Sequence, residues 1–95
     1  MKNIKIIDRT FLFSLKSIEL YKILQSEGEY IISKQLLRST TSIGANVHEA
    51  SAAISKKDFA HKMSIASKEA RESDYWIQLL DKGKLTKCDL EFYKE

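Results

Sequence analysis

The residues that could carry out catalysis or bind a metal are few in this chain: His48, His61, the single cysteine Cys88, and the glutamates Glu69 and Glu72. A di-iron helical bundle needs a glutamate three residues before each metal-binding histidine, and neither histidine has one. One cysteine provides neither a disulfide partner nor a cysteine pair for zinc. The two glutamates could be paired carboxylates, but with no cleft evident in the sequence they are more typical of ion pairs. We therefore predict no catalytic residue, no metal and no cofactor, and a protein that is not an enzyme.

Lysines are the second group with a chemical role to consider, because they can bind phosphate. The chain has 16 Lys and Arg against 13 Asp and Glu, a formal net charge of +3 and a pI near 9.0. The lysines that could contact nucleic acid all lie in its second half: Lys56, Lys57, Lys62, Lys68, Lys82, Lys84 and Lys87. Phosphate binding depends on clustered cations, so this modest excess permits an RNA or DNA partner without requiring one. The alternative is that these lysines are only solvated.

The elements that must position these residues are predicted to be helices. The chain has no proline and only three glycines, so the strongest helix breakers are almost missing. Its 95 residues allow one hydrophobic core, and we expect a single domain over residues 1–95. No apolar stretch approaches the roughly 20 residues that cross a bilayer, and the amino terminus lacks a secretory core. These features, with the single cysteine, indicate a cytoplasmic protein with no membrane partner.

Hydrophobic periodicity predicts three long helices joined by short connections, which implies antiparallel neighbours. The first is expected from about residue 8 or 10 to residue 26, with these residues facing inward: Phe11, Leu15, Ile18 and Leu24. The second is expected to begin at residues 29–33 and to carry an apolar seam: Leu36, Thr40, Ile43, Val47, Ala50 and Ile54. The third follows a capping-box sequence over residues 55–58 and repeats the same spacing: Phe59, Met63, Ala66, Ala70, Ser73, Ile77 and Leu80.

A second cap-like sequence, from Thr86 to Asp89, predicts the start of a fourth helix that carries Leu90, Phe92 and Tyr93. The predicted fold class is therefore all-α, an antiparallel up-down-up-down four-helix bundle with its fourth helix truncated or incomplete. A helix of so few residues is marginal alone, since isolated helices need about 12 to 15 residues in water. We expect either a longer gene product or another subunit to complete the bundle.

A polar stripe runs beside the apolar seam of the second predicted helix. Its residues recur every three or four positions: Gln35, Arg38 with Ser39, Ser42, Asn46 and Glu49. Glu69 and Glu72 on the third helix are placed to pair with Arg38. One interpretation is the solvated flank of an amphipathic helix; the other is a hydrogen-bond network that fixes helix register or subunit contacts. Gly44 slightly favours the second, because a glycine inside a helix is best explained by the close approach of another backbone.

Several segments together resemble one protein family. They are Gln35–Ser39, Thr41–Val47, Glu49–Ala50, Ser55–Phe59, Ser64–Ala66 and Lys68–Glu72. These segments are similar to those of the four-helix-bundle proteins encoded in intervening sequences of 23S ribosomal RNA genes. The resemblance extends from about residue 13 to residue 93.

The resemblance implies a bacterial up-down-up-down bundle that assembles into a ring-like homo-oligomer, with a pentamer favoured. It also implies a relation to the accessory variability determinant of diversity-generating retroelements, a basic pentameric barrel that binds nucleic acid and a reverse transcriptase. The family motif falls on the polar stripe and its partners: Gln35, Arg38, Ser42, Asn46, Glu49, Glu69 and Glu72. Two departures are the incomplete fourth helix and a charge lower than the retroelement branch usually has, which argues against tight nucleic-acid binding.

Two function classes are compared. The first is a ring-like oligomer that binds RNA or DNA weakly through the lysines and not through aromatic stacking. The second is a protein adaptor, for example one that docks a reverse transcriptase, with Tyr75 and Trp76 as anchors because aromatic residues are enriched at binding hot spots. A Trp76 buried inside one subunit, with Lys56 and Lys57 clustered on the oligomer, would favour the first class. An exposed Trp76 in an apolar patch would favour the second.

Overall fold

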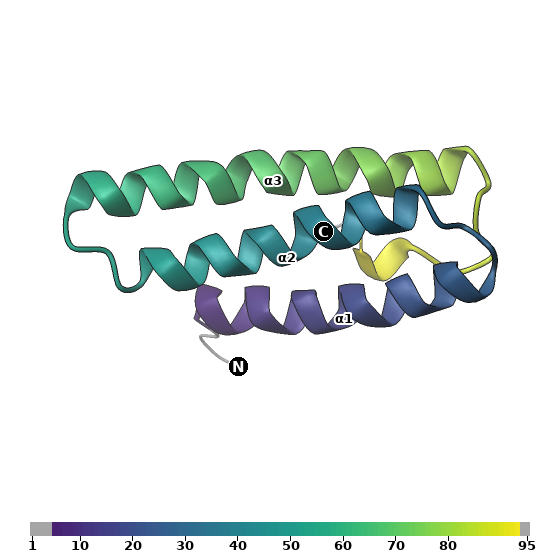
Figure 1. The fold of residues 1–95 in the computed structure, drawn as a ribbon, viewed down its shortest axis with the longest axis horizontal. Helices are drawn as coiled ribbons and strands as arrows, with labels where there is room; N and C mark the ends of the chain where they lie inside the picture. The colour runs from purple at the N-terminus through teal and green to yellow at the C-terminus, as the bar shows by residue number, and fades with distance from the viewer. Residues whose placement is uncertain (1–4, 94–95) are drawn as a thin grey trace.

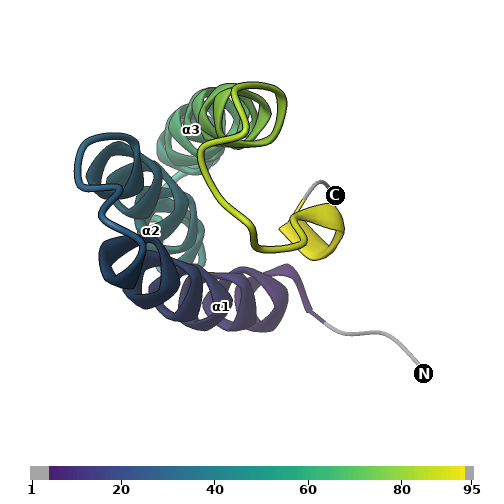
Figure 2. The ribbon, with the colours of Figure 1, turned by 90° about the vertical axis from the view of Figure 1, so that its right-hand side faces the viewer.

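The computed structural model describes residues 5–93 and places three α-helices in an up-down-up arrangement. They are α1 (Ile6–Ser26), α2 (Ile32–Ala50) and α3 (Lys56–Lys82), followed by the 3-10 turn η1 (Glu91–Tyr93). α1 and α3 each pack against α2. Seen along the helices, α2 stands at a corner, and the last described segment returns between α1 and α3 (Figures 1 and 2). The described residues contain no strand, so the all-α prediction holds.

The helix ends follow from local hydrogen bonding. Gly28 has a φ of +84°, a conformation that favours glycine, and ends the turn after α1. The Glu29 carboxylate accepts hydrogen bonds from the backbone N–H groups of Ile32 (3.0 Å) and Ser33 (2.6 Å), which satisfies free amides at the start of α2. Ser55 Oγ accepts from the Asp58 N–H at 3.0 Å, so the predicted cap of α3 is present.

The core lies at one end of the bundle, where the carboxyl-terminal segment meets α1, α2 and α3. Its buried members are Leu20, Leu24, Leu36, Ile77, Leu80 and Leu90. Ile32, Trp76, Cys88 and Tyr93 pack against them and are partly buried. Eight of the predicted seam residues of α2 and α3 are buried: Leu36, Thr40, Val47, Ala50, Ala66, Ser73, Ile77 and Leu80. Three were predicted wrongly, because Ile54, which lies beyond α2, and Phe59 and Ala70 of α3 are exposed.

The predicted inward face of α1 was largely wrong. Leu24 is buried, but the exposed fractions of Phe11, Leu15 and Ile18 are 63%, 45% and 38%. The helix turns Ser17 and Leu20 inward instead. The reason is that α1 carries apolar residues around most of its circumference, so their spacing alone does not determine which side is buried.

The predicted fourth helix was also wrong. Residues 83–90 contain no helix, and only the three residues of η1 follow them in the described chain. Thr86 Oγ1 accepts from the Cys88 N–H (3.0 Å) and Asp89 Oδ1 from the Glu91 N–H (3.0 Å), so the side chains expected to cap a helix form local turns instead. Leu90 fixes this segment in the core; the side chain of Phe92 lies outside the described residues.

Gly44 confirms the expected close approach of another backbone. A Cβ atom added there would lie 2.9 Å from Ser14 Oγ and 3.3 Å from the Thr10 carbonyl oxygen of α1. The side chains of Ser14 and Thr10 are small enough to permit this short distance between the helices. Their hydroxyls donate hydrogen bonds to carbonyl oxygens of their own helix. At Gly44 the two helices therefore approach each other through small residues, while Leu20 and Leu24 of α1 pack with Leu36 of α2 in the core.

Candidate functional site

A cluster of charged side chains joins α2 to α3 at the middle of the bundle. The Arg38 guanidinium donates to Glu69 Oε1 at 3.2 Å and to Glu72 Oε2 at 2.5 Å. Trp76 Nε1 donates to the same Glu72 oxygen at 3.0 Å. The exposed fraction of the Glu69 side chain is 9%, whereas that of Arg38 is 49%. The cluster therefore runs from the inside of the α2–α3 contact to its surface.

The hydrogen bonds of this cluster stabilise the charged forms of its members. The pKa of Arg38 is raised above its ordinary value, first by its hydrogen bond to Glu72 and then by that to Glu69. The pKa of Glu72 is lowered by the hydrogen bond from Arg38 and, to a smaller extent, by that from Trp76. At neutral pH the cluster therefore holds the Arg38 cation beside the Glu72 carboxylate.

Two serines connect the same helices below this cluster. Ser39 Oγ lies 2.7 Å from Ser73 Oγ, and both side chains are buried. Ser39 also donates to the Leu36 carbonyl oxygen (3.1 Å), and Ser73 to that of Glu69 (2.9 Å). Sequence reasoning placed Ser73 in an apolar seam and missed the pair. The sequence did contain a signal: Ser73 occupies a seam position of the third predicted helix, and Ser39 lies in the polar stripe of the second.

The remaining stripe residues do not join one network. Asn46 Nδ2 donates to the Ser42 carbonyl oxygen (2.9 Å) and to its Oγ (3.2 Å), within α2. Glu49 pairs with Lys62 of α3 at 2.8 Å, which lowers the pKa of Glu49 and raises that of Lys62. Gln35 is exposed. The structure thus brings α2 and α3 together through Arg38 and Glu49, while a role of the stripe in subunit contacts stays a prediction.

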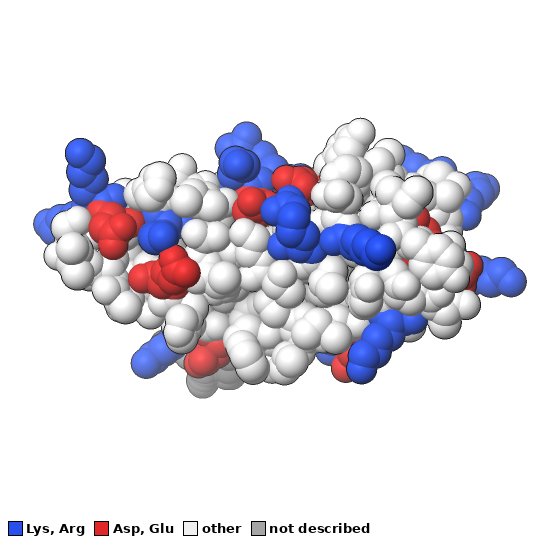
Figure 3. Space-filling model, viewed as in Figure 1, with Lys and Arg blue, Asp and Glu red and all other residues white. Residues whose placement is uncertain are grey.

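The seven predicted lysines form two groups at opposite ends of α3. Lys56, Lys57 and Lys62 lie at its beginning, and Lys82, Lys84 and Lys87 lie at or after its end, with Lys68 between. The nearest members of the two groups, Lys62 and Lys82, are about 30 Å apart along α3, at 1.5 Å per residue. Six of the seven side chains are exposed and Lys62 is partly buried. Figure 3 shows Lys and Arg at both ends of the molecule and near its middle.

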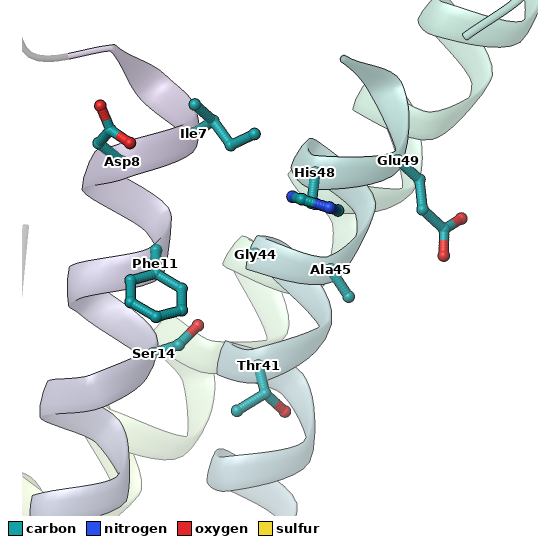
Figure 4. A pocket seen from close by; sticks show the side chains of 9 residues that line it. All are labelled: Ile7, Asp8, Phe11, Ser14, Thr41, Gly44, Ala45, His48 and Glu49. Carbon is teal, nitrogen blue, oxygen red and sulfur yellow. The ribbon is translucent and has the colours of Figure 1, made fainter. Parts of the chain in front are cut away.

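An open cleft of about 630 Å³ lies between α1 and α2. Phe11 and Ile7 of α1 face Gly44, Ala45 and His48 of α2 across it (Figure 4). Among residues 5–93, no group of three or more His, Cys, Asp and Glu side chains is placed to hold a metal ion. Sequence reasoning missed this cleft because it placed Phe11 in the core.

None of the helices among the described residues is both long enough and apolar enough to cross a membrane. The fold and the site define a small helical protein in which α2 is fixed to α3 by charged and hydroxyl side chains and to α1 by small residues and by leucines of the core.

Comparison with known proteins gives the family. The chain belongs to the 23S rRNA-intervening sequence protein family, whose profile matches residues 2–93. A similar solved structure is a protein of unknown function from the S23 ribosomal protein family of Bacteroides thetaiotaomicron. It is 44% identical, with a TM-score of 0.82, and the alignment covers 84% of this chain and 75% of that one. Among curated proteins, none matches the chain.

Proposed function

We propose that the protein is a non-enzymatic helical scaffold that forms a ring-like homo-oligomer, a pentamer, and binds nucleic acid weakly through its lysines. The family supports a role connected with ribosomal RNA genes, since its name refers to the 23S rRNA. The retroelement accessory proteins, which the sequence resembles, supply the precedent for a ring that binds nucleic acid.

The nucleic-acid part of the proposal is supported by a difference in ion pairing between acidic residues and lysines. The acidic residues of the α2–α3 contact are engaged: Glu69 and Glu72 by Arg38, and Glu49 by Lys62. No ion pair within residues 5–93 engages Lys56 or Lys57, nor Lys84 or Lys87. These exposed cations are therefore available to phosphates, and five copies at +3 each give a ring a formal charge of about +15.

A salt titration tests this proposal. Binding of a fluorescein-labelled 20-nucleotide single-stranded RNA is followed by anisotropy between 50 and 200 mM KCl. We expect a dissociation constant of about 10⁻⁶ to 10⁻⁴ M that rises with salt, as for phosphate contacts without sequence recognition. Binding that does not weaken with salt, or no binding at 50 mM, would contradict the proposal.

Variants locate the contacts. In Lys84→Ala/Lys87→Ala, loss of two phosphate contacts is expected to reduce the salt slope by about 1.4, at about 0.7 per contact for single strands. Lys22→Ala is the matched control, because Lys22 is an exposed lysine of α1 outside both groups. An equal effect of the control would show a general charge effect and not a site.

The adaptor alternative depended on an exposed Trp76. Instead the indole packs against the core, donates its N–H to Glu72, and contacts Tyr75 edge to face with ring centroids 5.2 Å apart. Tyr75 itself is exposed. Because one aromatic of the two is held by the bundle, we place nucleic-acid binding first and the docking of a protein such as a reverse transcriptase second.

A further inference from the structure

Tyr75 is an exposed aromatic side chain that its neighbours hold in place. It is 57% exposed, and its ring contacts that of Trp76 with the centroids 5.2 Å apart and an angle of 63° between the planes. Trp76 in turn packs against the core and donates its N–H to Glu72 at 3.0 Å. A ring that is already restrained loses little conformational freedom when a ligand binds to it. Tyr75 therefore offers a fixed aromatic surface to the outside.

Two cations share the face of α3 on which Tyr75 lies. Arg71 and Lys68 precede Tyr75 by four and seven residues, so the three side chains follow one another along one side of the helix. Both cations are exposed. The pKa of Glu72 is lowered chiefly by its hydrogen bond from Arg38, and the charge of Lys68 adds a smaller effect, which places Lys68 near the same carboxylate.

Two further cations come from α2. Ser39 of α2 contacts Ser73 of α3, and the two helices are antiparallel, so Tyr75 is level with the turn of α2 that contains Lys34 and Arg38. Both of these side chains are exposed as well. Cations from both helices thus flank the ring. We call the ring and its four cations the Tyr75 surface: Tyr75, Lys34, Arg38, Lys68 and Arg71.

The Tyr75 surface carries an excess of positive charge. The acidic residues beside it are Glu69 and Glu72, and Arg38 engages both of them. The exposed fraction of the Glu69 side chain is only 9%. No ion pair within residues 5–93 engages the other three cations of the surface. These three cations are therefore available to an anionic ligand, and Figure 3 shows Lys and Arg near the middle of the molecule as well as at its ends.

The combination of a fixed ring and free cations selects one class of ligand. Proteins that bind single-stranded nucleic acid stack bases on aromatic side chains and pair the phosphates with Lys and Arg. In a double helix the faces of the bases are covered by their neighbours, so a duplex could use only the cations. A protein contact usually has few charges at its centre, whereas here four cations surround the ring.

We infer that the Tyr75 surface binds single-stranded RNA or DNA, with one base stacked on the Tyr75 ring and the adjoining phosphates paired with Lys34, Lys68 and Arg71. The inference rests on the proposed nucleic-acid binding, and it names the form of nucleic acid and the residue that recognises it. The sequence predicted binding without aromatic stacking. The exposure of Tyr75 beside four cations is the observation that changes this expectation.

Two oligonucleotides of equal charge test the inference by fluorescence anisotropy in 50 mM KCl. One is fluorescein-labelled oligothymidylate of 20 nucleotides, and the other is a labelled abasic 20-mer, which has the same phosphates without bases. Tyr75→Ala removes the ring, and Tyr75→Phe keeps it. Tyr30→Ala is the matched control, because Tyr30 is 55% exposed but lies in the α1–α2 connection. Circular dichroism and light scattering establish that each variant keeps the fold and the mass of the wild type.

We expect the wild type to bind oligothymidylate more tightly than the abasic 20-mer by about 5- to 150-fold, the range for one stacked base. Tyr75→Ala is expected to lose this preference, whereas Tyr75→Phe and Tyr30→Ala keep it. Tyr75→Leu, which retains an apolar contact with Trp76, replaces the alanine variant if that variant does not fold. In Lys68→Ala/Arg71→Ala the salt slope for both oligonucleotides is expected to fall by about 1.4, at about 0.7 per phosphate contact.

Three results would overturn the inference and leave the proposed phosphate binding intact. They are equal, salt-dependent binding of both oligonucleotides by the wild type, an unchanged preference after removal of the Tyr75 ring, and an equal loss of preference in Tyr30→Ala. Binding of neither oligonucleotide at 50 mM KCl would overturn this inference together with the proposed nucleic-acid binding, and it would favour a protein partner for Tyr75.

Discussion

The contact between Arg38 and Glu69 offers the most direct test of how α2 is fixed to α3. The Glu69 carboxylate is 9% exposed and accepts from Arg38 at 3.2 Å. The substitution Arg38→Met keeps the length of the side chain and removes its charge, so this carboxylate loses the cation that compensates its burial.

The size of the effect follows from the burial of the two partners. Removing one member of a fully buried pair costs about 3 to 5 kcal/mol, whereas a fully exposed pair contributes about 0.2 to 1 kcal/mol. Arg38 is 49% exposed, so water replaces part of the lost contact. We expect a loss of about 2 kcal/mol, which lowers the melting temperature of a domain of this size by about 8 to 16 °C.

A double-mutant cycle separates the pair from other effects of the substitution. Unfolding in urea is followed by circular dichroism for Arg38→Met, Glu69→Gln and the double variant, at pH 7 and one protein concentration because assembly adds to stability. Glu69→Gln keeps the acceptor oxygen without its charge, so we expect a coupling energy of about 1 kcal/mol.

Lys34→Met is the control, since Lys34 is an exposed cation one turn earlier on α2, and its expected effect is within about 0.5 kcal/mol. Equal costs of Arg38→Met in the wild-type and Glu69→Gln backgrounds would refute the assigned role of the ion pair.

Three further predictions concern the core, the α1–α2 contact and pH. Leu90→Ala is expected to cost about 2 to 4 kcal/mol in urea unfolding, because Leu90 is 3% exposed in the core; a cost below about 1 kcal/mol would mean that the segment does not stabilise the bundle. Gly44→Val forces α1 away and is expected to cost about 1 to 3 kcal/mol by thermal unfolding, against less than about 0.5 kcal/mol for the exposed helical Ala60→Val. The pKa of Glu72 is lowered in the folded state, so its stabilisation is complete above its ordinary value near 4.5 and is lost as the pH falls through the folded pKa. Urea unfolding at pH 7 and pH 3.5 should therefore show a smaller acid loss for Glu72→Gln than for wild type, and an equal loss would contradict the assignment.

The sequence correctly indicated the features that depend on local chemistry. The lack of proline and the short connections predicted antiparallel helices, Ser55 predicted the start of α3, and the seam of α2 predicted Leu36, Thr40 and Val47 as buried. Gly44 predicted a close backbone contact because no local reason places glycine inside a helix. Each of these features has a local signal in the sequence, such as a cap, a regular spacing or a glycine inside a helix, so one sequence suffices to predict it.

The tertiary structure decided the rotation of α1 and the path of residues 83–93. α1 has apolar side chains on several sides, and the small residues Thr10 and Ser14 opposite Gly44 select the side that meets α2, which leaves Phe11 outside. In the last segment, caps at Thr86 and Asp89 were predicted from local propensity, but these side chains bond to nearby turns while Leu90 enters the core.

The sequence by itself determined the helices and the residues available to join them, because hydrogen bonds along a helix and its caps are local. Only the tertiary structure decided which apolar residues become core and which become surface, because burial depends on the shape that neighbouring helices leave open. Phe11, Leu15 and Ile18 are as hydrophobic as Leu20 and Leu24, and they are exposed because α2 contacts another side of the same helix.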